Sequence, residues 1–361
     1  MRILQIPCNT PYVRKLHDGP RFSIVNGTTF GRAQVIPAEI TFQFMLEHAF
    51  DSAFWNSFDI AHIHYGFELE PHDTVAEALG LISDHGKPIV YTYHEPHSMH
   101  GADDSPYQRL LTLIASQASG IITLTAAAQQ DLQRIVPDSR PAVIAPHGYA
   151  LNPDNPYFCR DRSQETDARV LLYSSIRRNR DLVTSTTNLL MGAVPGTRTT
   201  LLTRPAPNAE ALKELSALLT LAFTSPHGTV SFELPLSDDD LAQRISTMDI
   251  LVLPYLYAGH SGALEMAFDT GLLPVITNVG YLSYQCEIWD QLAPTHVAAD
   301  WSDEKPWAYQ QRLMAAVKEA VAQLQEFRAS LDPDARRRYR REEHLQILRT
   351  HNEVYRAALA A

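Results

Sequence analysis

The most specific chemical pattern in the chain is a loop-to-helix turn that follows the apolar run Ile250–Pro254. The turn His260-Ser261-Gly262-Ala263 places small residues where a helix has unpaired backbone N–H groups and a positive dipole end. Such a turn is an anion site suited to a diphosphate. Glu265, one turn into the helix, carries a carboxylate that can accept hydrogen bonds from a pair of ribose hydroxyls. The alternative is that Ser261 is only an N-cap and Glu265 only a first-turn acid.

A second candidate for anion binding is the loop Ser174–Arg180, at the carboxyl end of a predicted strand. It holds three arginines in four positions, Arg177, Arg178 and Arg180. Arg177 and Arg180 lie one helical turn apart and can hold a diphosphate through charge-assisted hydrogen bonds. The alternative is a solvated basic loop. Because an anion site and a cation pair are both expected on the same cleft, each supports the interpretation of the other as a diphosphate contact.

These residues need elements that position them, and the first half of the chain repeats a β-branched run, a loop and a helix. The predicted strands are Arg2–Pro7, Asp59–His64, Pro88–His94, Gly120–Leu124 and Ala142–Ala145, with helices at 34–50, 73–85, 105–118 and 126–136. This alternation predicts βαβ units and a parallel sheet. Several runs are apolar throughout, as expected for strands covered on both faces.

Residues Tyr149–Asp167 are polar and rich in turn formers, which predicts a linker, and the α/β pattern then starts again. The predicted strands are Arg169–Ser174, Thr199–Thr203, Thr229–Glu233, Asp249–Pro254 and Leu273–Thr277, with helices at 181–191, 208–222, 238–247 and 262–270. We therefore expect a first domain at 1–150 and a second at 168–334. The C-terminal helix, 335–361, is expected to pack back on the first domain. Ligands are expected in the cleft beyond the carboxyl ends of the strands.

The composition excludes several classes of protein. The 361 residues, 45% apolar and 20% charged, are those of a globular protein of two domains. No apolar run reaches the roughly 18 residues of a membrane helix, and the first residues predict a strand and not a signal peptide, so we expect a cytoplasmic protein. The net charge of -11 argues against a nucleic-acid binder. Three distant cysteines suggest neither a disulfide framework nor a Cys-based zinc site.

Six short motifs follow one another along the chain. They are Phe58–His64, Pro88–His94, Ala118–Thr125, Val143–Gly148, Ser175–Arg180 and His260–Pro274. Together and in this order they resemble the GT-B fold glycosyltransferases, in particular the retaining family 4 (glycosyl transferases group 1). The resemblance implies two Rossmann-like parallel-sheet domains with an interdomain cleft. It also implies an enzyme that transfers a sugar from a nucleoside diphosphate sugar.

The resemblance implies roles for individual residues. Glu265 would bind the ribose, and Arg177 and Arg180 would stabilise the leaving diphosphate electrostatically. His94 would hydrogen-bond the transferred sugar or its phosphate, which makes the catalytic set His94, Arg177, Arg180 and Glu265. The backbone amides of the turn would meet the diphosphate, and Glu233-Leu234 would cradle the base. The donor-binding set is Ser175, Glu233, Leu234, Tyr257, Gly259, His260, Ser261, Gly262, Ala263 and Glu265.

The chain departs from the family at the sugar half of the donor site. Tyr257 stands eight positions before Glu265, where the family often has the first acid of a Glu-x7-Glu pair. A tyrosine is not an anion near neutral pH, so Ala258-Gly259-His260 is expected to contact the sugar instead. Arg180 replaces the family's lysine.

The acceptor side differs as well, because a long loop, Asn9–Gly31, takes the place of the family's Gly-Gly loop. Residues from this loop and from the strand ends of the first domain are predicted to meet the acceptor or a phosphate. The acceptor-binding set is Arg21, Asn26, Thr28, His64, Glu95 and His97.

The histidines offer two further kinds of chemistry. His62, His64 and His94 are candidates for a zinc site, but no Asp or Cys completes a ligand set at recognisable spacing, so hydrogen bonding to a sugar is favoured. Neither a metal nor another cofactor is expected. Glu95 or His97 beside His94 is a candidate acid or base. A retaining transfer does not require one, because the leaving diphosphate can take the acceptor proton.

The run Arg336–Arg341 is the one basic cluster, and Glu342-Glu343 follow it directly. It predicts a solvated helix face in preference to a membrane contact. Membrane association is therefore not expected, the acceptor is expected to be a soluble small molecule or glycan, and a homodimer is left open.

The function predicted from these features is a retaining, metal-independent transfer from a UDP- or GDP-sugar to an acceptor hydroxyl. Inversion is disfavoured because only Glu68 and Glu95 offer a carboxylate base in the first domain. One alternative is a sugar-nucleotide epimerase or hydrolase on the same fold. The other, motivated by Tyr257, is a sugar-nucleotide binder without catalysis.

Overall fold

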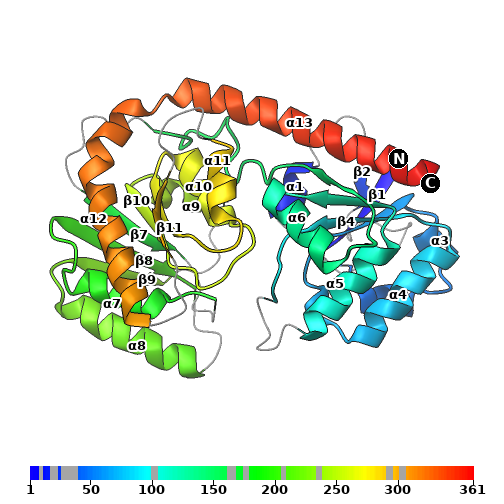
Figure 1. Ribbon diagram of the computed structural model, residues 1–361, viewed down its shortest axis with the longest axis horizontal. Coiled ribbons are helices and arrows are strands. Elements are labelled where there is room, and N and C mark those ends of the chain that lie inside the picture. Colours follow the sequence, from blue (N-terminus) through cyan, green and yellow to red (C-terminus); the bar gives the residue numbers. More distant parts are fainter. Residues whose placement is uncertain are drawn as a thin grey trace. The chain divides into compact units, whose positions relative to one another are not determined.

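The computed structural model (Figure 1) describes residues 1–7, 11–16, 23–25, 40–98, 105–160, 168–173, 179–204, 209–232, 238–289, 296–300 and 306–361. The chain divides into two compact units. The first comprises Met1–His147 with Glu343–Ala361, and the second comprises Gly148–Glu342. The described residues of each unit form one six-stranded sheet, in which all neighbouring strands pair in parallel.

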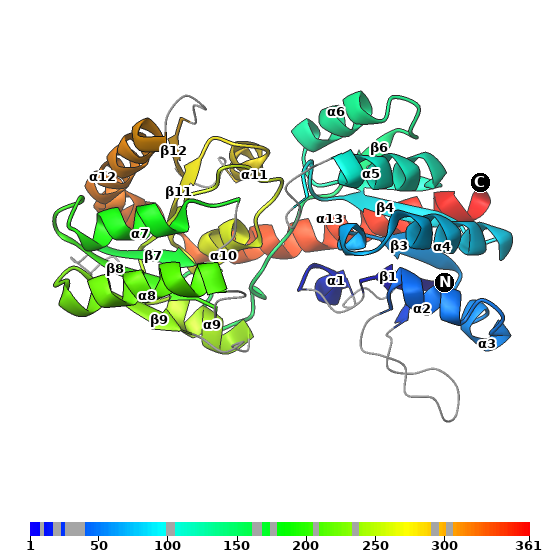
Figure 2. The same ribbon diagram turned by 90° about the horizontal axis from the view of Figure 1, so that it is seen from below.

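The sheet of the first unit has the strand order β2-β1-β3-β4-β5-β6. Its strands are β1 (Arg2–Ile6), β2 (Ser23–Val25), β3 (Ile60–Ile63), β4 (Ile89–Tyr93), β5 (Gly120–Thr123) and β6 (Ala142–Ile144). The helices between them are α1 (Pro11–Leu16), α2 (Phe42–Glu47), α3 (Ser52–Trp55), the 3-10 helix η1 (Phe67–Leu69), α4 (His72–Asp84), α5 (Ser105–Gln117) and α6 (Ala126–Ile135). Helix α4 packs between α2 and α5, as Figure 2 shows.

The sheet of the second unit has the order β12-β11-β10-β7-β8-β9. Its strands are β7 (Ala168–Tyr173), β8 (Thr197–Thr203), β9 (Gly228–Phe232), β10 (Ile250–Leu253), β11 (Leu273–Thr277) and β12 (Val297–Ala299). Its helices are α7 (Leu182–Leu190), α8 (Ala209–Thr224), α9 (Asp238–Ile245), α10 (Gly262–Thr270), α11 (Leu282–Glu287), α12 (Pro306–Ser330) and the first part of α13 (Pro333–Ala360).

The strand orders locate the place in each unit where a ligand is expected. In the second unit the chain runs outward from β7 to β9, then returns to the centre and runs outward on the other side from β10. In the first unit the same reversal falls between β1 and β3. Helices that follow the two central strands lie on opposite faces at such a reversal, so a crevice opens beyond the strand ends. A ligand is therefore expected next to the residues that follow β7 and β10, or next to those that follow β1 and β3.

The central strands are buried along their whole length. Every residue of β3, β4, β10 and β11 is buried, which explains why these runs are mostly apolar and do not alternate. His62 in β3 and Thr92 in β4 are buried polar exceptions. The predicted α/β class with parallel sheets is confirmed. The described part of the chain contains no helix that combines the length and apolar character needed to cross a membrane.

The segment between β1 and β3 differs from its prediction. A single loop was expected at Asn9–Gly31, but the chain forms helix α1 and the edge strand β2 within it. The helix expected at 34–50 is the shorter α2, which begins after Thr41, whose side chain accepts from the Phe44 amide at 3.1 Å. The elements α1, β2 and α2 are all short, and hydrophobic periodicity is a weak signal over so few residues.

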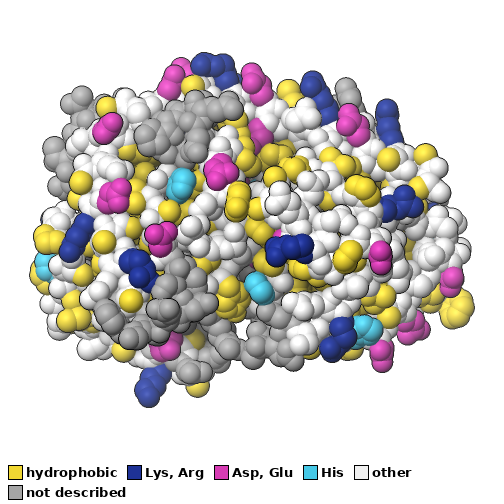
Figure 3. Space-filling model, viewed as in Figure 1, with side chains coloured by type: hydrophobic (Ala, Val, Ile, Leu, Met, Phe, Trp, Pro, Cys, Tyr) yellow, Lys and Arg dark blue, Asp and Glu magenta, His cyan; other side chains and the backbone are white. Residues whose placement is uncertain are grey.

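The basic run of α13 is also corrected by the structure. Arg336 and Arg340 are buried, at 2% and 0% exposure, and are not part of a solvated face. Arg336 donates to the Phe268 carbonyl and Arg337 to the carbonyls of Pro153 and Phe158, all within the second unit. On the face drawn in Figure 3, basic and acidic side chains are interspersed and neither kind forms a continuous patch.

The later part of α13 belongs to the first unit, from Glu343 onward. Its side chains Ile347, Val354 and Tyr355 join Ile3 and Ile60 in one buried apolar cluster. The C-terminal helix thus contributes to the core of the first unit, while its beginning contributes to the second.

A buried carboxylate, Asp249, ties the second sheet to α12. It accepts the Arg169 amide at 2.8 Å and pairs with Arg328 at 2.8 Å. Burial on its own would raise the pKa of Asp249, but the hydrogen bonds and charges of Arg328 and Arg169 outweigh it and lower that pKa below its ordinary value. A carboxylate with a lowered pKa stabilises the folded state above its unfolded pKa, and this contribution is lost as pH falls through the folded pKa.

We predict that Asp249→Asn lowers the free energy of unfolding by about 3 kcal/mol at pH 7, because it leaves the buried Arg328 without its counter-charge. The deficit should start to shrink as pH falls below about 4, where Asp249 of the unfolded parent becomes protonated, and should go on shrinking as pH falls through the lowered pKa of folded Asp249. Urea unfolding at a series of pH values measures both effects. The control is Asp334→Asn, an exposed partner of Arg337 at 3.9 Å, which should change stability by less than about 0.5 kcal/mol. Equal effects of the two changes would contradict the assignment.

Candidate active site

The turn before α10 has the geometry of a helix N-terminus. Ser261 is the N-cap, and its hydroxyl accepts the Leu264 amide at 3.3 Å. The Ser261 amide does not face a ligand as predicted, because it donates to Gln285 Oε1 at 3.0 Å. The amides of Gly262 and Ala263 have no acceptor among the described residues. The N-cap alternative is thus correct for Ser261, and two of the three predicted backbone donors remain.

Arg180 lies beside this turn. A short bridge pairs it with Tyr255, and its Nη2 donates to the Tyr255 hydroxyl at 2.7 Å. That hydroxyl is 3.1 Å from the Ser261 hydroxyl. The Arg180 guanidinium stacks over the Tyr255 ring at 4.5 Å. The buried Nε of Arg180 has no hydrogen-bond acceptor in the described part of the chain. The residues after β7 and β10 therefore meet where the strand order reverses, and they present unsatisfied donors.

The loop between β10 and α10 is held against the segment that follows β11. The Tyr281 amide donates to the Gly259 carbonyl at 3.3 Å. At Gly280, with φ of +56°, a Cβ atom would lie 1.6 Å from the Ala258 carbonyl oxygen, so glycine is required there. The His260 ring lies 5.2 Å from the ring of Tyr281. Tyr257 is half-buried, and its carbonyl accepts from Asn179 Nδ2 at 3.5 Å.

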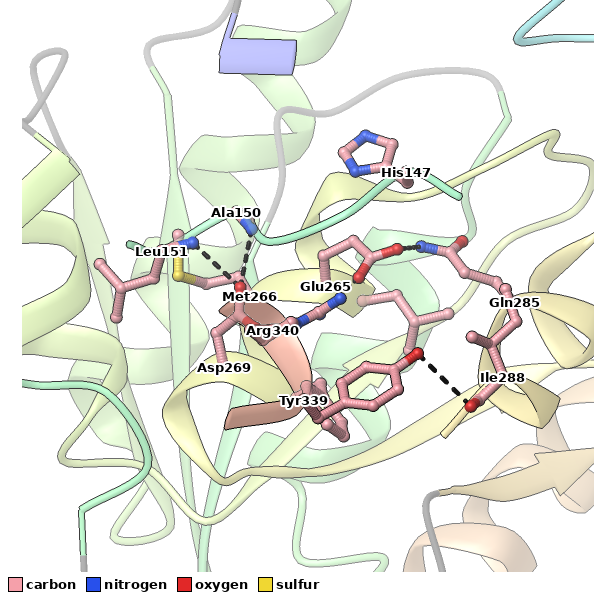
Figure 4. Close-up of polar contacts among 12 residues, drawn as sticks. His147, Ala150, Leu151, Glu265, Met266, Asp269, Gln285, Ile288, Tyr339 and Arg340 are labelled. Atoms are coloured by element: carbon pink, nitrogen blue, oxygen red, sulfur yellow. Dashed lines mark hydrogen bonds and ion pairs between the residues drawn. The ribbon is translucent and has the colours of Figure 1, made fainter. Parts of the chain in front are cut away.

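Glu265 is buried, at 2% exposure, and both carboxylate oxygens have protein partners. Oε1 accepts from Gln285 Nε2 at 2.6 Å and Oε2 pairs with Arg340 Nη2 at 2.5 Å, as Figure 4 shows. Gln285 also donates to the Ser261 carbonyl at 3.0 Å, so one side-chain amide joins the carboxylate to the turn before α10.

Asp269, one turn further along α10, shares the same arginine. Its Oδ1 pairs with Arg340 Nε at 2.7 Å, and its Oδ2 accepts the amides of Ala150 and Leu151 at 2.7 and 2.9 Å. Burial raises the pKa of Asp269, although the charge of Arg340 and the two amides act against it. Figure 4 shows both acids pointing at Arg340 from one face of α10.

In the first unit, His64 follows β3 and His94 follows β4, and the structure brings the two rings together. His64 Nδ1 lies 3.4 Å from His94 Nε2, and the ring of Tyr65 packs edge-on against His94 at 5.2 Å. Both histidines are buried, at 1% and 7% exposure. Glu95 and His97 are half-buried. The described residues contain no group of three His, Cys, Asp or Glu side chains that could hold a metal ion.

Several predicted site residues lie outside the described residues. They are Arg177 and Ser175 after β7, Glu233 and Leu234 after β9, and Arg21, Asn26 and Thr28 in the N-terminal loop.

Three residues at the site were missed from the sequence: Tyr255, Gln285 and Arg340. Tyr255 and Gln285 act through side-chain contacts to the turn, and no local pattern marks them. For Arg340 there was a signal, because Arg336 and Arg340 are one helical turn apart and so share one face of a helix. Two arginines on one buried face require acidic or carbonyl partners.

We predict that Arg340→Met lowers the free energy of unfolding by about 3–5 kcal/mol, because it leaves two buried carboxylates without a cation. The matched control is Arg338→Met, an exposed arginine of the same helix turn, which should change stability by less than about 0.5 kcal/mol. Adding Glu265→Gln and Asp269→Asn to Arg340→Met should recover part of the loss. If urea unfolding shows no recovery, charge compensation is not the role of Arg340.

The sequence matches no protein-family profile, and no curated protein is similar to it in sequence. Solved structures are similar in fold. The Anabaena protein Alr3699/HepE in complex with UDP and glucose has a TM-score of 0.66 at 11% identity, over 98% of this chain and 98% of that one. Sucrose-phosphate synthase from Thermosynechococcus elongatus has a TM-score of 0.64 at 15% identity, over 99% of each chain.

A third similar structure is the catalytic domain of starch synthase IV from Arabidopsis thaliana, bound to ADP and acarbose. Its TM-score is 0.54 at 14% identity, over 85% of this chain and 77% of that one. At these identities the likeness concerns the fold. The expected pair of Rossmann-like parallel-sheet units is confirmed, and the chain has the GT-B fold of glycosyltransferases.

Proposed function

We propose that the protein transfers a sugar from a nucleoside diphosphate sugar to an acceptor hydroxyl, with retained anomeric configuration. The observation that supports the proposal most is the set of unsatisfied donors at the strand reversal of the second sheet. The amides of Gly262 and Ala263 and the buried Nε of Arg180 lack acceptors among the described residues. Gly262 is exposed and Ala263 half-buried, so their amides are open to a ligand. A buried donor such as Nε of Arg180 is rarely left unpaired in a folded protein, and a bound anion would satisfy all three donors.

The same donors supply the electrostatics that the reaction needs. Breaking the bond from the sugar to the diphosphate builds negative charge on the leaving group. Preorganised N–H groups and a guanidinium stabilise that charge in the transition state without reorganisation. These groups provide positive charge independently of a metal, so we propose a metal-independent transfer.

The nucleotide part of the donor is supported by the structural neighbours. One neighbour was solved with UDP-glucose, another with UDP, and a third with ADP. We propose a UDP-sugar as the first donor to test and a GDP-sugar as the second. We propose that Glu265 accepts hydrogen bonds from the ribose hydroxyls.

At the carboxyl end of the first sheet, both ring nitrogens of His64 have protein partners, so His64 is not the acceptor contact predicted from the sequence. We propose that His94 contacts a sugar hydroxyl. Tyr257 replaces an acid near the proposed sugar, and this supports one second candidate, a protein that binds sugar nucleotides without turnover.

We predict that UDP raises the melting temperature of the parent protein, because a ligand that binds only the folded state stabilises it. Arg180→Met should weaken UDP binding about tenfold or more, since a charge-assisted hydrogen bond is lost. The control is Arg198→Met, an exposed arginine on β8, which should leave the shift unchanged. GDP and ADP in the same thermal-shift series identify the base. If none of the nucleotides shifts the melting temperature, the proposed donor site is wrong.

We predict that incubation with the UDP-sugar and an acceptor panel releases UDP and yields a product with the donor's anomeric configuration, identified by NMR. The rate should be the same with and without a metal chelator. Release of UDP and free sugar without an acceptor, or an isomerised donor, would instead indicate the hydrolase or epimerase. Binding of UDP without any turnover would indicate the non-catalytic binder.

A further inference from the structure

The first unit contains a cluster of buried polar side chains whose hydrogen bonds form one continuous chain. Its members come from β1, α1, β3, β4 and α13, and each is at most 7% exposed. They are Gln5, Tyr12, His62, His64, Thr92, His94, His351 and Tyr355. A neutral histidine and a side-chain amide donate at one atom and accept at another, and a hydroxyl does both through its one oxygen. The donor-to-acceptor direction of the whole chain is therefore set by any contact in it that allows only one donor.

The contact that sets the direction lies in α13. His351 Nδ1 is 2.8 Å from the Ile347 carbonyl oxygen. A carbonyl only accepts, so Nδ1 carries the hydrogen. Burial lowers the pKa of His351 to about 4, so the ring is neutral near pH 7 and its Nε2 is an acceptor. The Tyr12 hydroxyl, 3.4 Å from that Nε2, must then be the donor.

The next three links follow because each hydroxyl has a single hydrogen. Burial raises the pKa of Tyr12, and a hydrogen bond with the Thr92 side chain acts against it. Tyr12 uses its hydrogen on His351, so in this bond its oxygen accepts from the Thr92 hydroxyl. The Thr92 oxygen therefore accepts from His62 Nε2 at 2.7 Å. Burial lowers the pKa of His62 well below its ordinary value, so its other nitrogen, Nδ1, is an acceptor. The Tyr355 hydroxyl donates to it at 2.7 Å.

The last links lead to the proposed sugar contact. The Tyr355 oxygen accepts from Gln5 Nε2 at 3.3 Å, which directs Gln5 Oε1 toward His64. His64 Nε2 donates to that oxygen at 2.5 Å. Burial also lowers the pKa of His64, so its Nδ1 is an acceptor, and the partner at 3.4 Å, His94 Nε2, must carry a hydrogen.

We propose that this buried chain, oriented by the Ile347 carbonyl, holds His94 as the tautomer protonated at Nε2, so that Nδ1 is the ring atom that accepts a hydrogen bond. Tyr355 and His351 are then positioning residues, which act on His94 through other side chains and do not touch a substrate. That a sugar hydroxyl is the group that donates to Nδ1 rests on the proposed function. The assignment of the tautomer does not rest on it.

The reverse direction is excluded by the chemistry of the first link. It would place an imidazole lone pair against the Ile347 carbonyl oxygen, and two acceptors at 2.8 Å repel each other. In the direction assigned, each donor meets one acceptor along the whole chain. A chain that is fully satisfied in only one direction specifies a single arrangement.

The test is the protonation pattern of the imidazole rings, from long-range 1H–15N NMR of the full-length protein labelled with 15N at histidine. The His94 signals are identified by their loss in His94→Gln. We expect a protonated Nε2 and an unprotonated Nδ1 for His94 in the parent. A parent His94 protonated at Nδ1 would overturn the proposal.

The matched variants are Tyr355→Phe and Tyr91→Phe, which each remove one hydroxyl from a fully buried tyrosine of the first unit. The Tyr91 hydroxyl has no hydrogen-bond partner among the described residues. Tyr355→Phe should let His94 exchange between both tautomers, with 15N shifts moving toward the mean of the two forms. Tyr91→Phe should leave the His94 spectrum as in the parent.

An unchanged His94 tautomer in a folded Tyr355→Phe protein would contradict the proposal. If Tyr355→Phe does not fold, Tyr12→Phe breaks the chain at another link, and the same result is expected of it. The measurement needs no substrate. A protein that fails to bind UDP or to transfer a sugar would therefore refute the proposed function and leave the tautomer assignment standing.

Discussion

The second unit depends on how one arginine neutralises two acids on a single helix. Glu265 and Asp269 lie one turn apart on α10 and pair with Arg340 at 2.5 and 2.7 Å. All three side chains are almost completely buried. Glu265, in the first turn, is favourably placed against the helix dipole, whereas Asp269 lies near the negative end. A cation between them compensates both. The Asp269 carboxylate can then also hold the amides of Ala150 and Leu151, at the start of the unit.

This compensation has a consequence for anion binding. A bare carboxylate at Glu265 would repel a diphosphate bound one turn away, because Coulomb interactions are strong where water is excluded. Arg340 approaches Glu265 while Gly262, Ala263 and Arg180 supply the donors at the turn. The two arginines therefore offset the two acids of α10, and the N–H groups at the positive end of the helix dipole add partial positive charge at the turn. Gln285 connects the turn to Glu265, because its side chain is hydrogen-bonded to the Ser261 amide, the Ser261 carbonyl and the Glu265 carboxylate.

The sequence predicted those parts of the molecule that repeat a local pattern. The apolar strands β3, β4, β10 and β11 and the helix start at Ser261 were located because burial on two faces and capping leave local signatures. The meeting of Arg180 with the turn followed from the order of parallel strands. The partners of the predicted residues could not be found in this way. Arg340 reaches Glu265 across 75 positions of sequence, and Tyr355 reaches His62 across 293. Such contacts depend on tertiary packing, which short-range periodicity does not encode.

The two units thus control their polar groups by different physical means. In the second unit the groups are ions, arginines and carboxylates whose attraction depends on distance and burial and hardly on which atom carries a hydrogen. In the first unit the groups are neutral, because burial lowers the pKa values of His62, His64 and His351. Their arrangement is fixed by the direction of the hydrogen bonds, because each group must donate to one neighbour and accept from the other. A site for a dianionic diphosphate calls for charge, and a site that distinguishes the hydroxyls of a sugar calls for donors and acceptors at defined atoms. The residues of each unit supply the kind of control that its proposed ligand requires.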